Sequence, residues 1–361
     1  MTPKYIRLSN LLKEQIVSNI RKGNDTLPTE EKLCKKYGVS RQTVRHALEI
    51  LIEEDLIERR QGSGTYIKDS SPNSVKRQVA VLLAYDNEYT YPNIFGDLLA
   101  VFNRENYSST LYLTENKVIK EREFLRHLLK HPVHGIIVEP VLSALPNPNL
   151  DLYEMLRERG TVILFLSGFY PNFPAFSFVK SDDFYGGYVL GKYLLQKNHR
   201  VITGIFRSDD QKGLQRYHGL ITALTDSSAA FQDESIGWFS TDDLTDLQKN
   251  QDTGFLAEFI RKKLKSCSAV VCYNDEIAYW LIKELNNAGI LVPADVSIVS
   301  FDNSYLSNFG SQRITSLSHN SHELGRTAAS GLISLMRGEP FASVNLSWHL
   351  INRNSDAIRE D

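Results

Sequence analysis

Residues 37–48 read YGVSRQTVRHAL, and this stretch decides the fold of the first part of the chain. Gly38 can adopt the left-handed backbone that ends a helix, and the hydroxyl of Ser40 can cap the next one. The apolar residues of that next helix recur at helical spacing up to residue 55, and they are Val44, Ala47, Leu48, Leu51 and Ile52. The stretch therefore predicts two helices joined by a tight turn.

Two helical patterns precede this turn. Apolar residues recur at helical spacing over residues 5–20, and Gly23 follows as a stop. A shorter helix begins after Pro28, where Thr29 can cap its free amides, and it ends at Gly38. The sequence therefore predicts three helices within the first 55 residues.

A β-hairpin follows the third helix. Residues 56–60 and 65–68 have the pattern of short strands, and the glycines of the connection, Gly62 and Gly64, permit a tight turn. Three helices and a small β-wing predict a mainly α-helical winged helix-turn-helix over residues 1–69. Residues 69–74 are polar, lack an apolar period and contain a proline, so we expect a linker over residues 70–77.

Charge is unevenly distributed along the 361 residues. Residues 1–68 contain 13 Lys and Arg against nine Asp and Glu, a net charge of +4, so the rest carries −6 and the whole chain −2. A basic segment can bind nucleic acid, and it can equally be a solvated surface. Charge alone leaves both interpretations open.

Side chains that can contact DNA gather at the start of the third helix and on the wing. In a helix-turn-helix this end of the helix enters the major groove, where Arg can bond bidentately to guanine and Gln to adenine. Arg59 and Arg60 flank the wing as candidate phosphate contacts. The residues expected at the DNA are Thr29, Ser40, Arg41, Gln42, Thr43, Arg45, Gly62, Ser63 and Gly64.

Three segments in a fixed order make the interpretation more specific. They are LPTE at 27–30, YGVSRQTVRHAL at 37–48 and QGSGTY at 61–66. This order resembles the gluconate-repressor (GntR) family across essentially the whole first domain. The resemblance implies that Arg41, Arg45 and the wing residues contact double-stranded operator DNA as a homodimer. Thr29 stands where many members have serine, and threonine still caps a helix.

Residues 78–361 alternate between β-rich and helical patterns. The apolar runs that predict strands are residues 79–84, 135–138, 162–166, 201–206, 269–272 and 296–301. The amphipathic stretches between them include residues 121–129, 188–196 and 276–288. Such alternation predicts parallel sheets covered by helices on both faces. The length favours an α/β domain of two Rossmann-like lobes, with ligand held at the carboxyl ends of the strands.

Polar side chains follow several of these runs. Asn274 lies two residues after one predicted strand and Asp302 directly after another, while Arg216 lies in the helical pattern after residues 201–206. A carboxylate, an amide and a guanidinium suit sugar hydroxyls, and four aromatic side chains are candidates to cover a sugar ring: Tyr89, Tyr91, Phe169 and Tyr170. The alternative is structural, because Asn or Asp after a strand often caps the next helix and Arg216 can pair with a surface carboxylate.

The second domain also resembles a known fold. Its segments GIFRSDDQKG at 204–213, CYNDEIA at 272–278 and IVSFDN at 298–303 look like the lactose/galactose-repressor effector domain, itself similar to periplasmic sugar-binding proteins. IIVEP at 136–140 with SALPNPN at 143–149 is similar to the arabinose-metabolism repressors of Gram-positive bacteria. Ser300 stands where the broader family usually has glycine.

The resemblance implies a set of effector contacts and an effector. The matching pocket positions are Glu139, Arg216, Asn274, Asp302 and His319. His319 can equally be a structural hydrogen-bonding residue. The implied effector is L-arabinose, and the implied combination is a GntR-type reading head fused to a two-lobed, periplasmic-binding-protein-like domain.

Two alternatives remain beside a sugar-responsive regulator. Doubly wound folds also host enzymes, but the chain contains no Gly-x-Ser-x-Gly elbow, phosphate-binding Gly-Lys-Ser/Thr loop or strand-linked Gly-x-Gly-x-x-Gly. We therefore expect no catalysis and no cofactor. The second alternative keeps the architecture but responds to another carbohydrate or to a purine.

Cysteine content and hydropathy indicate the cellular compartment in which the protein is expected. Three cysteines, Cys34, Cys267 and Cys272, are too few and too dispersed for a disulfide framework or a zinc site, so no metal is expected. Residues 1–10 lack the apolar core of a secretory signal, and no apolar run has membrane-spanning length. With the resemblances, these features predict a cytoplasmic, homodimeric repressor of sugar-utilisation genes that sugar releases from its operator.

Overall fold

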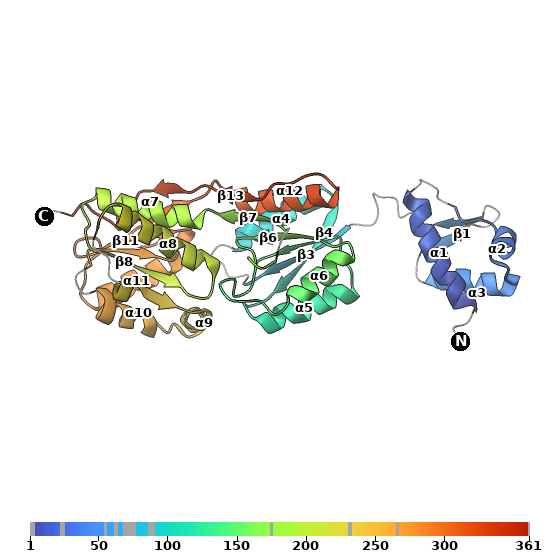
Figure 1. Ribbon diagram of the computed structural model, residues 1–361, viewed down its shortest axis with the longest axis horizontal. Helices are drawn as coiled ribbons and strands as arrows, with labels where there is room; N and C mark the ends of the chain where they lie inside the picture. Colours follow the sequence, from blue (N-terminus) through green and yellow to red (C-terminus); the bar gives the residue numbers. More distant parts are fainter. Residues whose placement is uncertain are drawn as a thin grey trace. The chain divides into compact units, whose positions relative to one another are not determined.

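The computed structural model describes residues 4–21, 26–53, 56–60, 64–67, 77–85, 91–173, 176–229, 233–264 and 267–359. The chain divides into two compact units, Met1–Lys76 and Arg77–Asp361 (Figure 1). This division falls within the expected linker of residues 70–77, of which residues 70–76 lie outside the described part. Each unit has hydrophobic clusters of its own.

The first unit is a winged helix-turn-helix, as the sequence predicts. Its elements are α1 (Lys4–Arg21), α2 (Glu30–Tyr37), α3 (Arg41–Glu53), β1 (Ile57–Arg60) and β2 (Gly64–Ile67). β1 and β2 pair antiparallel and form the wing. The core includes buried aliphatic side chains from the three helices, which are Leu8, Leu12, Ile16, Leu33, Val44, Ala47, Leu48 and Leu51, together with Leu27 and with Ile57 of β1. Ile52, which the pattern assigned to the apolar stripe, lies at the edge of that stripe and is 37% exposed.

The turn between α2 and α3 forms as its residues predict. The hydroxyl of Thr29 accepts the backbone N–H of Lys32 at 3.4 Å and caps α2. Gly38 ends this helix with φ at 63°, in the left-handed region. The hydroxyl of Ser40 accepts the N–H of Thr43 at 3.3 Å and caps α3. These local interactions fix the direction in which α3 leaves α2.

The second unit contains two lobes, each built on a six-stranded sheet. The first sheet has the order β13-β7-β6-β5-β3-β4. Its strands are β3 (Arg77–Leu83), β4 (Tyr107–Leu113), β5 (Gly135–Val138), β6 (Val162–Leu166), β7 (Ser177–Ser181) and β13 (Val344–Leu346). All neighbouring strands described in this sheet are parallel.

The second sheet has the order β14-β12-β11-β10-β8-β9. Its strands are β8 (Ile202–Arg207), β9 (Gly237–Phe239), β10 (Ala269–Cys272), β11 (Ser297–Phe301), β12 (Thr315–Ser318) and β14 (His349–Ile351). Only β14 runs antiparallel to its neighbour among the described strands. Six predicted strands are thereby confirmed, whereas β4, β7, β9, β12, β13 and β14 were not predicted.

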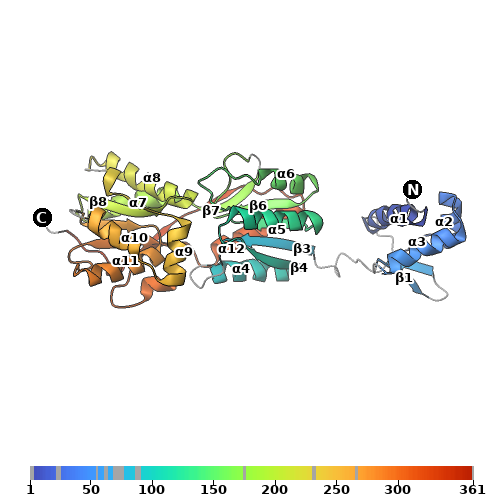
Figure 2. The ribbon, with the colours of Figure 1, turned by 90° about the horizontal axis from the view of Figure 1, so that it is seen from below.

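Helices cover both faces of each sheet (Figure 2). In the first lobe α4 (Tyr91–Arg104) and α12 (Glu323–Met336) pack on one face, with α5 (Val118–Lys130) and α6 (Leu150–Glu158) on the other. In the second lobe α7 (Asp183–Gln196) and α8 (Gln211–Asp226) lie opposite α9 (Thr241–Asn250), α10 (Gly254–Phe259) and α11 (Asp275–Asn287). Short helical turns complete the unit: η1 (Asp233–Ser235), η2 (Ile260–Leu264) and η3 (Tyr305–Asn308).

The chain crosses between the lobes three times. It crosses after β7, returns after β12 to form α12 and β13, and crosses again before β14. The lobes are therefore not consecutive halves of the sequence. Because the three crossing segments lie between the same two sheets, any relative movement of the lobes must bend all of them.

Two glycines bring α7 and α8 into backbone contact. A Cβ on Gly219 of α8 would lie 1.9 Å from the carbonyl oxygen of Phe184, and a Cβ on Gly187 of α7 would lie 2.1 Å from that of Arg216. No side chain fits at such distances without separating the helices. The glycines therefore place Arg216 against the first turn of α7.

We expect Gly219→Ala to lower the free energy of unfolding by about 3 kcal/mol, because the added methyl meets backbone that cannot rotate away. Gly96→Ala is the matched control, since Gly96 is an exposed helical glycine with open space around its Cα, and it should stabilise by up to about 1 kcal/mol. Urea unfolding measures both values. Equal effects of the two substitutions would show that the α7–α8 approach is not tight.

Candidate functional site

The start of α3 presents polar side chains to solvent. Arg41, Gln42 and Arg45 are exposed, and Thr43 is half-buried. Arg45 also donates from Nε to the carboxylate of Glu30 on α2, at 3.2 Å. This exposed, basic helix start has the chemistry that base edges and phosphates require.

The remaining residues expected at the DNA have different positions. Thr29 and Ser40 are exposed and cap α2 and α3. Gly64 opens β2 with φ at 119°, a conformation that favours glycine, and nothing lies within 4 Å of where its Cβ would be. Gly62 and Ser63 lie outside the described residues.

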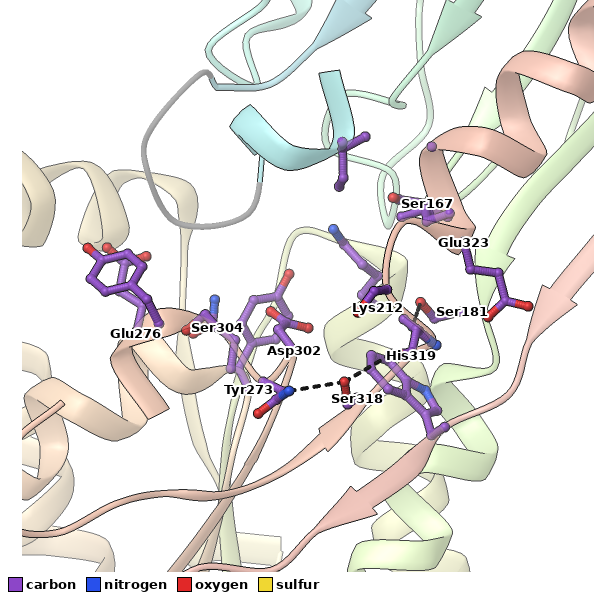
Figure 3. Close-up of a pocket in the computed structure, with 18 of the residues that line it drawn as sticks. Ser167, Ser181, Lys212, Tyr273, Glu276, Asp302, Ser304, Ser318, His319 and Glu323 are labelled. Carbon is purple, nitrogen blue, oxygen red and sulfur yellow. Dashed lines mark hydrogen bonds between the residues drawn. The ribbon is translucent and has the colours of Figure 1, made fainter. Parts of the chain in front are cut away.

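A cavity of about 360 Å³ lies in the second unit, and residues of both lobes line it (Figure 3). Four of the five expected effector residues are among its lining: Arg216, Asn274, Asp302 and His319. Glu139 is not among the lining residues. Its carboxylate lies 3.5 Å from Nζ of Lys212, which does line the cavity. Four of the predicted residues thus line one cavity, and the fifth, Glu139, contacts a lining residue, Lys212.

Arg216 is the buried centre of this cavity, with only 3% of its surface exposed. Its Nε donates to Asp183 Oδ1 at 2.8 Å, Nη1 donates to the carbonyl of Tyr273, and Nη2 reaches Asp302 Oδ1 at 3.4 Å. The guanidinium also lies 4.1 Å from the ring centroid of Phe301. The structural alternative that the sequence left open for Arg216, pairing with a surface carboxylate, is wrong, because Asp183 is buried.

Asn274 and Asp302 follow neighbouring strands at the same sheet edge. Asn274 Oδ1 accepts the N–H of Ile277 at 3.0 Å, so this residue also caps α11. Asp302 has φ at 93°, an unusual value for a residue with a side chain. Beneath them Asp275 is fully buried, and desolvation raises its pKa to about 7. Ser300 donates to the Asp275 carboxylate, which gives the departure from glycine a structural role.

His319 joins the three crossing segments. Its Nδ1 lies 3.0 Å from the carbonyl oxygen of Ser347, and because a carbonyl only accepts, Nδ1 carries the proton. Nε2 then accepts the hydroxyl of Ser181 at 2.7 Å. The ring stacks on Trp348, with centroids 3.7 Å apart, and burial lowers the pKa of His319. Both ring nitrogens thus bond to protein atoms, which is the structural role that the sequence left open.

Two of the four aromatic side chains expected to cover a sugar ring, Phe169 and Tyr170, do not line the cavity. Tyr170 is buried in the first lobe, where its hydroxyl donates to the carboxylate of Glu121 at 2.7 Å, and Phe169 packs on Phe178. Their assignment to a sugar ring was wrong, because composition does not distinguish a core aromatic from a cavity aromatic. Tyr89 and the side chain of Tyr91 lie outside the described residues. Among the described residues, the Tyr and Trp side chains that line the cavity are Tyr85, Tyr273, Tyr305 and Trp348.

The SALPNPN segment forms a contact between the lobes. Its two asparagines, Asn147 and Asn149, donate to Glu121 at 2.7 and 2.8 Å, and this buried carboxylate fixes the loop. Ser143 at the start of the segment accepts the N–H of Gln211, the first residue of α8, at 2.9 Å. The sequence identified this segment only by resemblance, and its physical role is to join the lobes.

Sequence reasoning missed many of the cavity residues, among them Tyr273, Lys212 and Trp348. Tyr273 directly follows β10, so the rule that pockets form at strand ends applies to it. Lys212 lies in the first turn of α8, and Trp348 lies in the last crossing segment. No local pattern marks these two, because their position depends on how distant segments meet.

The described part of the chain has few other features of chemical interest. It contains no group of three or more His, Cys, Asp or Glu side chains that could hold a metal ion, and its three cysteines are free. Its helices include none that is long and apolar enough to cross a membrane.

Comparison with known proteins decides the family. Residues 4–67 match the bacterial regulatory proteins of the gntR family, and residues 192–355 match the periplasmic binding protein-like domain. The arabinose metabolism transcriptional repressor of Halalkalibacterium halodurans is 31% identical over 350 residues, covering 94% of this chain and 91% of that protein. The chain belongs to the family of these repressors. The repressor of the same description from Geobacillus stearothermophilus is 30% identical over 337 residues, covering 92% of this chain and 91% of that protein.

Solved structures support the fold of the repressor. A transcriptional regulator CelR in complex with cellobiose aligns with a TM-score of 0.66 at 20% identity, covering 94% of each chain. At this identity the likeness shows the fold alone. Together with the family, it makes this chain a transcriptional repressor with a reading head and a two-lobed α/β domain.

We expect Arg216→Met to lower the free energy of unfolding by about 3–5 kcal/mol, because Asp183 then remains buried without a counter-charge. The double variant Arg216→Met/Asp183→Asn removes both charges and should recover most of that loss. Chemical denaturation of the two proteins measures the difference. Equal destabilisation would attribute the effect to lost packing and not to the unpaired carboxylate.

Proposed function

We propose that this repressor controls sugar-utilisation genes and that L-arabinose, bound between its two lobes, releases it from operator DNA. The observation that carries the proposal is the cavity that Arg216, Asn274, Asp302 and Trp348 line together. Charged and amide groups around an aromatic ring suit the hydroxyls and the apolar face of a sugar. The choice of L-arabinose rests on the names of the two relatives that are 31% and 30% identical.

The residues have distinct roles in this proposal. Arg216, Asn274 and Asp302 bond the sugar, while Glu139 acts through Lys212. His319 contributes its ring face to the cavity and its nitrogens to the crossing segments. No cofactor takes part. At the DNA, Arg41, Gln42 and Arg45 contact base edges, Thr43 and the wing contact the sugar-phosphate backbone, and Thr29 and Ser40 hold the helices in place.

We also propose that the repressor acts as a homodimer in the cytoplasm, where it binds its operator DNA. An aromatic surface on the second lobe, where Tyr279 contacts both Trp280 and Phe309, is the candidate interface. Tyr305 begins the helical turn that precedes Phe309. Tyr305 is 57% exposed and Phe309 is 60% exposed. Aromatic side chains are enriched in protein interfaces, and a dimer places two reading heads on one operator.

The direction of the switch follows from linkage. A ligand shifts an equilibrium only by its different affinity for two states, so the sugar must bind best to a lobe arrangement that fits the operator poorly. The contacts that join the lobes, including Ser143 with Gln211 and Asn116 with Thr241, are the interactions that such a rearrangement alters.

We expect L-arabinose to raise the melting temperature of the repressor, since a ligand that binds only the folded state stabilises it. Asp302→Ala should weaken arabinose binding about 10- to 100-fold in calorimetry, because a charged hydrogen bond to a sugar hydroxyl is lost. Asp151→Ala is the control, because it removes an exposed carboxylate on α6. Stabilisation by adenine or hypoxanthine and none by pentoses would contradict the proposal, as would wild-type affinity in Asp302→Ala.

A further inference from the structure

We propose that Glu30 sets the DNA selectivity of the reading head. Its carboxylate bridges two arginines of the DNA-contacting elements, so that it holds Arg45 for base contacts and lowers the attraction of the head for any DNA. Glu30 would then act through Arg45 as a positioning residue, without touching a base.

The bridge joins three elements of the first unit. Glu30 is the first residue of α2, and its two carboxylate oxygens accept from Arg45 Nε on α3 at 3.2 Å and from Arg59 Nη2 on β1 at 2.9 Å. The Glu30 side chain is 28% exposed, against 60% for Arg45 and 44% for Arg59. One carboxylate thus ties the helix that reads DNA to the helix before it and to the wing.

Arg45 can bond to Glu30 and to a base at the same time, because the two bonds use different atoms of its guanidinium. A guanidinium has five N–H donors, and the bond to Glu30 engages Nε. The two terminal nitrogens form the edge that pairs with O6 and N7 of guanine. An arginine on a flexible stem loses rotamer entropy when it binds, and a bridge that already restricts it reduces this loss.

Fold stability does not explain the bridge. Exposed ion pairs stabilise a protein by about 0–1 kcal/mol, because water screens them. For DNA the charge matters more, since a carboxylate beside two arginines opposes phosphate binding on every sequence. The bridge therefore favours operator over other DNA in two ways, by restricting Arg45 and by weakening the contacts that carry no sequence information.

The neighbouring residue provides a matched control. Glu31 lies in the same first turn of α2, is 65% exposed and pairs with Lys35 at 3.3 Å. Glu30→Gln and Glu31→Gln therefore make the same change in net charge and in the field at the helix start. They differ in whether a bridge to Arg45 and Arg59 is lost.

The experiment measures the Kd of the full-length repressor for two duplexes at several salt concentrations. The first duplex is the tightest binder that the wild type selects from a randomised pool, and the second is its permuted sequence. For Glu30→Gln we expect equal or tighter binding to the permuted duplex, weaker binding to the selected one, and a selectivity ratio about tenfold lower. Glu31→Gln should change both Kd values by the same factor.

Arg45→Ala completes a double-mutant cycle. The Glu30→Gln effect on the selectivity ratio should disappear when Arg45 is already alanine, while the melting temperature of Glu30→Gln stays at that of the wild type. An unchanged ratio in Glu30→Gln overturns the proposal, as does a change equal to that of Glu31→Gln. An effect that persists in the Arg45→Ala background would show that Glu30 does not act through Arg45.

Discussion

The buried pair of Arg216 and Asp183 is the interaction on which the effector domain depends. Removing charged groups from water is costly unless they are paired, and each of these side chains is only 3% exposed. The pair joins α8 to α7, where two glycines allow the backbones to touch, and the same guanidinium reaches Asp302 at the end of β11. Arg216 therefore holds two helices together and also lines the cavity. A ligand at Asp302 also changes the surroundings of the charge that holds two helices together.

The crossing segments connect the cavity to the arrangement of the lobes. His319 lies in one of them and contacts the other two, through Ser181 and through Ser347 with the ring of Trp348, and it lines the cavity as well. Beyond the crossings, the SALPNPN loop meets the start of α8. Residues of both lobes and of their connection line this cavity, so a ligand bound there would contact both lobes. Such an arrangement allows ligand binding to move one lobe against the other.

Much of the fold follows from local sequence signals. The helices of the reading head were predictable because their caps and apolar stripes lie within a few residues of each other, as Thr29, Gly38 and Ser40 illustrate. Edge strands such as β4 were not, because a half-exposed strand lacks a continuous apolar run. The return of α12 and β13 to the first lobe depends on pairing between β7 and residues about 165 positions later, which no local pattern records.

At the site, strand ends marked Asn274 and Asp302, whereas Trp348 comes from a distant crossing segment. The bridge from Glu30 to Arg45 escaped notice for the same reason, since it joins residues on different helices.

In the proposed mechanism, sugar and operator oppose each other through one domain. The most direct test titrates L-arabinose into the repressor alone and into the repressor saturated with its selected duplex, at one salt concentration. The account predicts weaker sugar binding on DNA, by the same factor by which saturating sugar weakens operator binding. Equal sugar affinities in the two titrations would contradict the coupling, and tighter sugar binding on DNA would reverse the direction of the switch.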